Sequence, residues 1–167
     1  MLCFTYGSNM SARRLRARVP SARCVAVATL ARHQLRFHKR SREDGSAKCD
    51  AFYTRNPEDR VVGVIYDIDA AEKGVLDRFE GLGHGYDETV VTATTHAGER
   101  LDAQIYTATD IAESLIPYRW YHYHVLVGAR ENDFPRDYIE AIERTPVRED
   151  PDPERHRVEM AVYEPGH

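Results

Sequence analysis

The order of strand-like and helix-like segments constrains the fold of this chain more than any other feature. Residues 60–68 (RVVGVIYDI) are rich in branched residues and predict a buried strand. Two alternating segments, residues 86–95 and 101–109, flank the loop HAGER and predict a hairpin. Apolar residues at helical spacing predict helices within residues 69–82 and in the final third. Strands outnumber helices and do not alternate with them regularly. The order therefore favours an α+β fold with a small mixed, barrel-like β-sheet and flanking helices over a doubly wound parallel sheet.

We expect a single domain over residues 1–167, since domains usually run to roughly 100 to 200 residues. The polar stretch at residues 40–50 predicts a loop, followed by a short strand at residues 51–54. Residues 145–157 (TPVREDPDPERHR) are charged and rich in proline, which predicts a surface linker to a C-terminal tail. The tail fits either an added edge strand or a cover over a pocket.

Charge and cysteine content restrict the partner and the compartment. The formal net charge of -4 provides no general cationic surface for a phosphate backbone, so we expect no nucleic-acid partner. No apolar run approaches the roughly 20 residues of a membrane span, so we expect no membrane contact. The three cysteines lack the close pairing of a zinc or redox motif, which fits a reduced, cytoplasmic setting.

Two motifs that could indicate a cofactor or a metal lack the necessary context. Residues 81–86 (GLGHGY) follow a predicted helix and do not have the spacing of the dinucleotide motif GxGxxG. His122 and His124 would point apart on a helix, and no nearby Cys or carboxylate completes a ligand set, so we expect no metal site. The aromatic cluster at residues 118–123 fits core, pocket wall or interface equally well and therefore predicts no oligomeric state.

Glu80 is the carboxylate with the strongest indication of chemistry. It borders the apolar stripe of a predicted helix, beside Phe79 and four residues after Leu76. The glycines that follow at once leave room for a small ligand near the acid. Partial burial would raise the pKa of this carboxyl group and make it a better acid or base near neutral pH. The alternative is a helix-end glutamate that faces water.

The opening segment MLCFTYGSNM predicts a short strand that ends in a sharp turn at Gly7, Ser8 and Asn9. Successive backbone N–H groups in such a bend, at the start of a helix, could hold a carboxylate or a developing oxyanion. An ordinary strand-to-helix turn explains the same residues equally well. Ser8 does not lie in the GxSxG motif of a serine nucleophile, which disfavours a serine hydrolase.

Three blocks together resemble the γ-glutamylcyclotransferase-like family in their order and spacing. They are FTYGSNM near the N-terminus, LDRFEG at residues 76–81 and GARENDFPRDYIEAI at residues 128–142. The resemblance extends from Phe4 to about Ile142. It implies a γ-glutamylcyclotransferase-like fold and cyclisation of a γ-glutamyl amide to 5-oxoproline with release of the amine, without a cofactor.

The same resemblance implies a role for individual residues. Glu80 matches the acid/base of the family. The residues matched to substrate binding are Tyr6, Gly7, Ser8, Asn9, Tyr86 and Tyr121. Thr5 and the arginine-rich loop after Phe37 depart from common family members, and these departures bear on specificity more than on chemistry.

Two alternatives to a small γ-glutamyl amino acid substrate remain at the level of sequence. One is a cyclotransferase with the same residues that acts on γ-glutamylamines or on a γ-glutamyl group of a larger metabolite. The other is a non-catalytic small-molecule-binding domain of the same fold, because a fold does not fix a function. The presence of Glu80 argues for catalysis.

Overall fold

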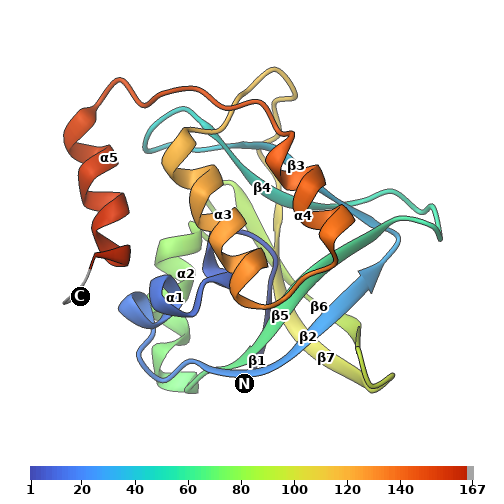
Figure 1. Ribbon diagram of the computed structural model, residues 1–167. Coiled ribbons are helices and arrows are strands. Elements are labelled where there is room, and N and C mark those ends of the chain that lie inside the picture. Colours follow the sequence, from blue (N-terminus) through green and yellow to red (C-terminus); the bar gives the residue numbers. More distant parts are fainter. Residues whose placement is uncertain (165–167) are drawn as a thin grey trace.

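The computed structural model describes residues 1–164, which form a closed five-stranded barrel, a two-stranded sheet and flanking helices (Figure 1). The strands are β1 (Leu2–Thr5), β2 (Arg23–Ala31), β3 (His33–Arg40), β4 (Ala47–Tyr53), β5 (Arg60–Asp67), β6 (Tyr86–Thr95) and β7 (Arg100–Ala108). The α-helices are α1 (Ala12–Arg18), α2 (Lys73–Glu80), α3 (Arg119–Glu131), α4 (Arg136–Glu143) and α5 (Pro153–Met160). Single 3-10 turns are η1 (Ser8–Met10), η2 (Ala70–Glu72) and η3 (Ala161–Tyr163). The predicted α+β class with a barrel-like sheet is confirmed.

The barrel closes through the first strand. Its order is β1-β5-β2-β6-β7, with β1 antiparallel to β5 and joined to β7 by a parallel pairing of Cys3 with Gln104. The β6–β7 hairpin pairs Tyr86 with Ala108, as the alternating pattern predicts. Closure pairs the barrel edges with one another. Because β1 ends at Thr5, the opening loop leaves the barrel at the next residue.

The helices pack around one side of the barrel. Figure 1 shows α3 across the front of the molecule, with α1 and α2 to its left and α4 to its right, while α5 stands at the outer left edge. Helix α3 contacts η1, α4 and α5 and thus connects the opening loop to the C-terminal segment. Within residues 1–164, no helix combines the length and the apolar character needed to cross a lipid bilayer.

The predicted loop at residues 40–50 is only partly correct, because β4 begins inside it. Ala47 pairs with Arg40, and the strand continues to Tyr53 rather than starting at residue 51. The side chain of Asp44 accepts hydrogen bonds from the backbone N–H and the hydroxyl of Ser46, each at 2.8 Å. These bonds close a tight turn, so the chain enters the strand four residues earlier than its polar composition suggests.

The second correction concerns the C-terminal segment. Residues 153–157, expected within a surface linker, form the start of α5, and the tail continues as a helix and a 3-10 turn rather than as an edge strand. Asp152 caps the helix by accepting hydrogen bonds from the N–H groups of Glu154 and Arg155, and Pro153 occupies the first turn. A proline-rich composition usually indicates a linker, but proline is compatible with the first turn of a helix. This segment can therefore form a helix that starts at Pro153.

Candidate active site

The opening loop forms one wall of the site. Residues Ser8, Asn9 and Met10 make the 3-10 turn η1, closed by a 3.0 Å hydrogen bond from the N–H of Met10 to the carbonyl of Gly7. Helix α1 begins two residues later. The backbone N–H groups of the opening loop therefore belong to this 3-10 turn and not to the first turn of α1. The side chains of Ser8 and Asn9 are buried. In the part of the chain that the structure describes, their backbone N–H groups have no hydrogen-bond acceptor and remain available to a ligand.

The GAREN block holds the opening loop from behind. A Cβ atom at Gly128 would lie 2.6 Å from the Cβ atom of Met10, so only glycine allows α3 to approach this closely. The Asn132 amide donates hydrogen bonds to the carbonyls of Met10, at 3.2 Å, and Gly128, at 2.8 Å. The hydroxyl of Tyr66 donates a third bond, at 2.9 Å, to the carbonyl of Met10. The FTYGSNM and GAREN blocks therefore pack together as one structural unit.

Glu80 is the last residue of α2 and meets the opening loop. Gly81 ends the helix in the left-handed conformation, with φ of 73°. The side-chain amide of Asn9 donates a 2.5 Å hydrogen bond to Oε1 of Glu80, and Arg18 donates a 3.1 Å bond to the side-chain oxygen of Asn9. These bonds orient the carboxylate toward the loop. The arrangement differs from the alternative of a helix-end glutamate directed to bulk water.

The surroundings change the acidity of this carboxyl group. Burial raises the pKa of Glu80 above its ordinary value of 4.5, while Arg18, Asn9 and Lys39 favour the carboxylate and oppose that rise. The position at the C-terminal end of a helix also disfavours negative charge. Glu80 thus combines a pKa closer to neutrality with an accessible oxygen, which suits a group that accepts and later donates a proton.

Tyrosine hydroxyls from several elements surround the carboxylate. Tyr6 donates a hydrogen bond to the carbonyl of Tyr106, and Tyr86 donates one to the carbonyl of Cys49. The hydroxyl of Tyr121 accepts a 3.0 Å bond from the N–H of Cys49. Burial raises the pKa of Tyr6, Tyr86 and Tyr121 well above the ordinary value, so these hydroxyls stay protonated. All four tyrosines line one cavity with Glu80.

The cavity has two connected parts. The inner chamber, about 30 Å³, is lined by the opening loop, the four tyrosines and Glu80, and has room for roughly two water molecules. The outer vestibule, about 400 Å³, shares Ser8, Glu80, Tyr86 and Tyr121 with the chamber. A vestibule of this volume has the size of a typical small-ligand pocket. Glu80 therefore lies at the boundary between a narrow chamber and a space that can hold a metabolite.

The predicted site residues converge, although they come from separate parts of the sequence. The cavity brings together every residue matched to substrate binding: Tyr6, Gly7, Ser8, Asn9, Tyr86 and Tyr121. Two further residues of the site were not predicted: Arg18, which hydrogen-bonds Asn9, and Tyr106, which lines the chamber. Arg14 and Arg18 are four residues apart, which places them on one face of α1, and this spacing could have indicated Arg18 as a site residue. No local signal identified Tyr106.

The two histidines of α3 contact protein groups. Nε2 of His122 lies 2.8 Å from the carbonyl of Ile142. Nδ1 of His124 lies 2.8 Å from the hydroxyl of Tyr163, and its Nε2 lies 3.3 Å from Glu159. Burial lowers the pKa of His124 to about 4, so this imidazole is neutral near pH 7. Both rings therefore connect α3 to other elements of the fold.

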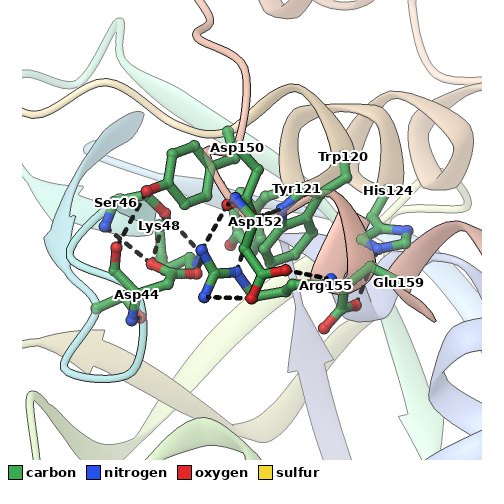
Figure 2. A network of polar contacts seen from close by, with 12 residues as sticks. Asp44, Ser46, Lys48, Trp120, Tyr121, His124, Asp150, Asp152, Arg155 and Glu159 are labelled. Carbon is green, nitrogen blue, oxygen red and sulfur yellow. Dashed lines mark hydrogen bonds and ion pairs between the residues drawn. The ribbon is translucent and has the colours of Figure 1, made fainter. Parts of the chain in front are cut away.

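A polar network attaches α5 to the wall of the vestibule. Figure 2 shows Arg155 against Asp150 and Asp152, next to Lys48 and Trp120. The fully buried side chain of Asp150 accepts hydrogen bonds from the indole N–H of Trp120, at 2.7 Å, and from Arg155, at 2.5 and 2.7 Å. These interactions and the contacts of Glu159 with Arg14 and His124, rather than a buried apolar face, fix the helix, because α5 has no buried residues.

Asp150→Ala is expected to lower the free energy of unfolding by about 3 kcal/mol, because it leaves Arg155 and the Trp120 N–H without their acceptor. Urea denaturation measures this loss, and hydrogen exchange should increase first in α5. Glu154→Gln, which removes an exposed carboxylate from the same helix, should cost less than about 1 kcal/mol. Equal stability of the two variants would contradict an anchoring role for Asp150.

Asp150 also makes the stability of the fold depend on pH. Hydrogen bonds from Arg155, Trp120 and the backbone lower the pKa of Asp150 to about 2 against the opposing effect of burial. Its contribution to stability is therefore complete above the unfolded-state pKa and disappears as the pH falls through the folded-state value.

The comparisons with known proteins agree with this geometry. The AIG2-like family model matches residues 60–142. γ-Glutamylcyclotransferase from Bos taurus is 31% identical over 140 residues, which cover 82% of this chain and 74% of that protein. The Homo sapiens enzyme of the same name is 31% identical over 144 residues, which cover 84% and 76%. The chain belongs to the γ-glutamylcyclotransferase family. This membership confirms the resemblance drawn from the three sequence blocks.

Solved structures show that the likeness extends over the whole γ-glutamylcyclotransferase fold. A structure titled γ-glutamyl cyclotransferase superimposes with a TM-score of 0.84 at 26% identity, covering 95% of this chain and 97% of that one. An uncharacterized protein from Homo sapiens superimposes with a TM-score of 0.80 at 28% identity, covering 88% of each chain. The barrel and its helices are therefore those of the γ-glutamylcyclotransferase family.

Proposed function

We propose that this protein cyclises a γ-glutamyl amide to 5-oxoproline and releases the amine, with Glu80 as the general acid and base. The observation that carries the proposal is the hydrogen bond between Glu80 and Asn9 at the boundary of the inner chamber and the vestibule. It joins the proton-transfer group to the loop that can hold the substrate. The names of the relatives support the reaction class.

The reaction suits this site because the substrate carries its own nucleophile. Glu80 takes a proton from the α-ammonium group, and the freed nitrogen attacks the γ-carbonyl carbon to form a five-membered ring. The tetrahedral intermediate then collapses with cleavage of the original amide C–N bond. Glu80 delivers a proton to the departing nitrogen, and the second proton of the ring nitrogen leaves with the released amine as its ammonium form. One C–N bond forms, one breaks, and the reaction consumes neither water nor a cofactor.

The remaining contribution of the protein is orientation and electrostatic stabilisation. The N–H groups of Ser8 and Asn9 can donate hydrogen bonds to the reacting carbonyl. The hydroxyls of Tyr6 and Tyr86 already donate to backbone carbonyls, so toward the substrate they act as acceptors. Confinement at the mouth of the chamber, beside Ser8, Tyr86 and Tyr121, would favour the folded rotamer of the γ-glutamyl group over extended ones. In well-oriented intramolecular reactions this proximity contributes roughly 7 to 11 kcal/mol to the lowering of the barrier.

A substrate panel tests the proposal. The protein is incubated with γ-glutamyl amino acids, γ-glutamylamines and γ-glutamyl peptides, and 5-oxoproline is measured by mass spectrometry. We expect 5-oxoproline and free amine in equal amounts from at least one class. If no compound yields 5-oxoproline, but compounds of the panel bind in calorimetry, the protein is a non-catalytic binding domain of the same fold.

The acid limb of the pH–rate profile should report Glu80. The base must be deprotonated, so kcat/KM should fall as the pH drops through a pKa that burial has raised above 4.5. Arg18→Met removes the cation that most strongly favours the carboxylate, so the acid limb should move to higher pH. Arg18 is itself charged near neutrality, because its pKa, although lowered by burial, is about 10.

The control for this profile is Arg13→Met, which removes an exposed arginine from the same helix. The acid limb of this variant should coincide with that of the unmodified protein. A profile that is flat down to about pH 4, or equal displacement by the two substitutions, would contradict a titrating Glu80.

A further inference from the structure

The outer vestibule carries an excess of positive charge. Seven lysine and arginine side chains line it, against four carboxylates, one of which is Glu80. Three of the cations have carboxylate partners within 2.7 Å: Arg14 pairs with Glu159, Lys48 with Asp44, and Arg155 with Asp150. These pairs belong to the framework that holds β4 and α5. The cations outside such pairs are the groups available to an anionic ligand.

Lys39 differs from Arg14, the other almost completely buried cation of the vestibule, because it lacks a carboxylate partner among the described residues. Its exposed fraction is 6%, yet it lines the vestibule. Within residues 1–164 its ammonium group has no hydrogen-bond acceptor and no carboxylate within ion-pair distance. Its described partner is the ring of Tyr86, whose centroid lies 4.5 Å from Nζ. A buried lysine side chain whose ammonium reaches a cavity with unused N–H donors can bind a ligand that supplies the acceptor.

The acids around Lys39 act on it from a distance, and three of the four are engaged elsewhere. They are Glu80, Asp110, Glu43 and Asp44. Asp110 lies 3.5 Å from the guanidinium of Arg40, and Asp44 pairs with Lys48. Glu80 accepts from Asn9. Burial lowers the pKa of Lys39, and the charges of these acids oppose the change. None of the four carboxylates lies within ion-pair distance of the ammonium in the part of the chain that the structure describes.

The position of Lys39 identifies which part of a substrate it would meet. Lys39 lines the vestibule but not the inner chamber, whereas Tyr86, which lies beneath its ammonium, lines both. The γ-glutamyl group that closes into a ring is too large for the inner chamber and fits at its mouth, where Ser8, Tyr86 and Tyr121 line both spaces. The amine that departs must lie on the open side of Glu80, where Lys39 stands.

We propose that Lys39 binds a carboxylate carried by the amine that the reaction releases. This specificity residue would favour γ-glutamyl amino acids and peptides over γ-glutamylamines, which have no such group. The inference rests on the proposed cyclotransferase activity and adds to it the residue that selects the leaving group.

The test compares two substrates that differ only by this carboxylate, γ-glutamyl-L-alanine and γ-glutamylethylamide. The unmodified protein should have a higher kcat/KM for γ-glutamyl-L-alanine. Lys39→Met keeps an unbranched side chain against Tyr86 but removes the charge. It should lower kcat/KM for γ-glutamyl-L-alanine by about tenfold or more, through KM, since a hydrogen bond to a charged group is lost. Because Lys39 also favours the Glu80 carboxylate, both substrates are compared on the pH plateau above the acid limb, where turnover of γ-glutamylethylamide should change little.

Arg78→Met is the matched control, because it removes a positive charge from an exposed residue of the same vestibule. The ratio between the two substrates should stay near that of the unmodified protein. If Lys39→Met fails to fold by circular dichroism, Lys39→Gln replaces it in the comparison. Formation of 5-oxoproline from γ-glutamylethylamide also shows whether a variant retains catalytic activity.

Each outcome bears on the inference. Selective loss for γ-glutamyl-L-alanine in the Lys39 variant supports it. Equal loss for both substrates would mean that Lys39 binds the γ-glutamyl group, and no loss would mean that it binds neither part; both results overturn the inference while leaving the cyclotransferase activity intact. Absence of 5-oxoproline from both substrates with the unmodified protein would instead overturn the proposed function and, with it, this role for Lys39.

Discussion

Glu80→Gln should retain the fold and substrate binding but lose most of the turnover, by a factor of about 100 to 10,000. The glutamine carbonyl can still accept the hydrogen bond from Asn9, so the geometry of the site is preserved. The amide cannot take up and return a proton at the pH at which a carboxylate does. Steady-state measurement of 5-oxoproline formation should show the loss in kcat, while calorimetry shows near-normal affinity for the substrate.

The matched control for this substitution is Glu140→Gln on α4, a partly exposed glutamate paired with Arg136. It should leave both kcat and the free energy of unfolding close to those of the unmodified protein. Full activity in Glu80→Gln would disprove its assignment as the acid/base. A loss of binding equal to the loss of turnover would make Glu80 a structural support of the opening loop instead.

Gly7→Val should weaken substrate binding by about tenfold or more. A Cβ atom at this position would lie 3.1 Å from the Cβ atom of Cys49 and 3.3 Å from the hydroxyl of Tyr121, before either valine methyl group is added. The loop would have to move away from β4 and α3, which would displace the N–H groups of Ser8 and Asn9. Calorimetric titration in a Glu80→Gln background, in which the substrate persists, measures the effect directly.

Gly7→Ala provides the graded control, since it adds the Cβ atom without branching. Its affinity should fall between those of glycine and valine. Circular dichroism establishes that both variants fold. If valine binds the substrate as tightly as glycine does, the opening loop does not cradle it, and the role of the loop is confined to connecting β1 with α1.

The hairpin and the barrel-like sheet were predictable because they depend on local periodicity. The alternation in residues 86–95 and 101–109 specifies which side chains face the interior, and the register of β6 with β7 follows from it. The start of β4 and the helix α5 were not predictable in this way. Side chains of Asp44, Asp150 and Asp152 stabilise them, and a polar composition does not reveal which partners such groups will find.

The sequence by itself determined the fold class, the family and the residues expected at the site, because each follows from periodicity or from motifs of short range. The tertiary structure decided how these residues act on one another. It brought Asn9 to Glu80 across seventy-one positions of the chain and packed Gly128 against Met10, so that GAREN supports the opening loop. It also buried Lys39 at the wall of the vestibule. Contacts of this kind depend on barrel closure, which joins residues distant in sequence, and no local pattern encodes that distance.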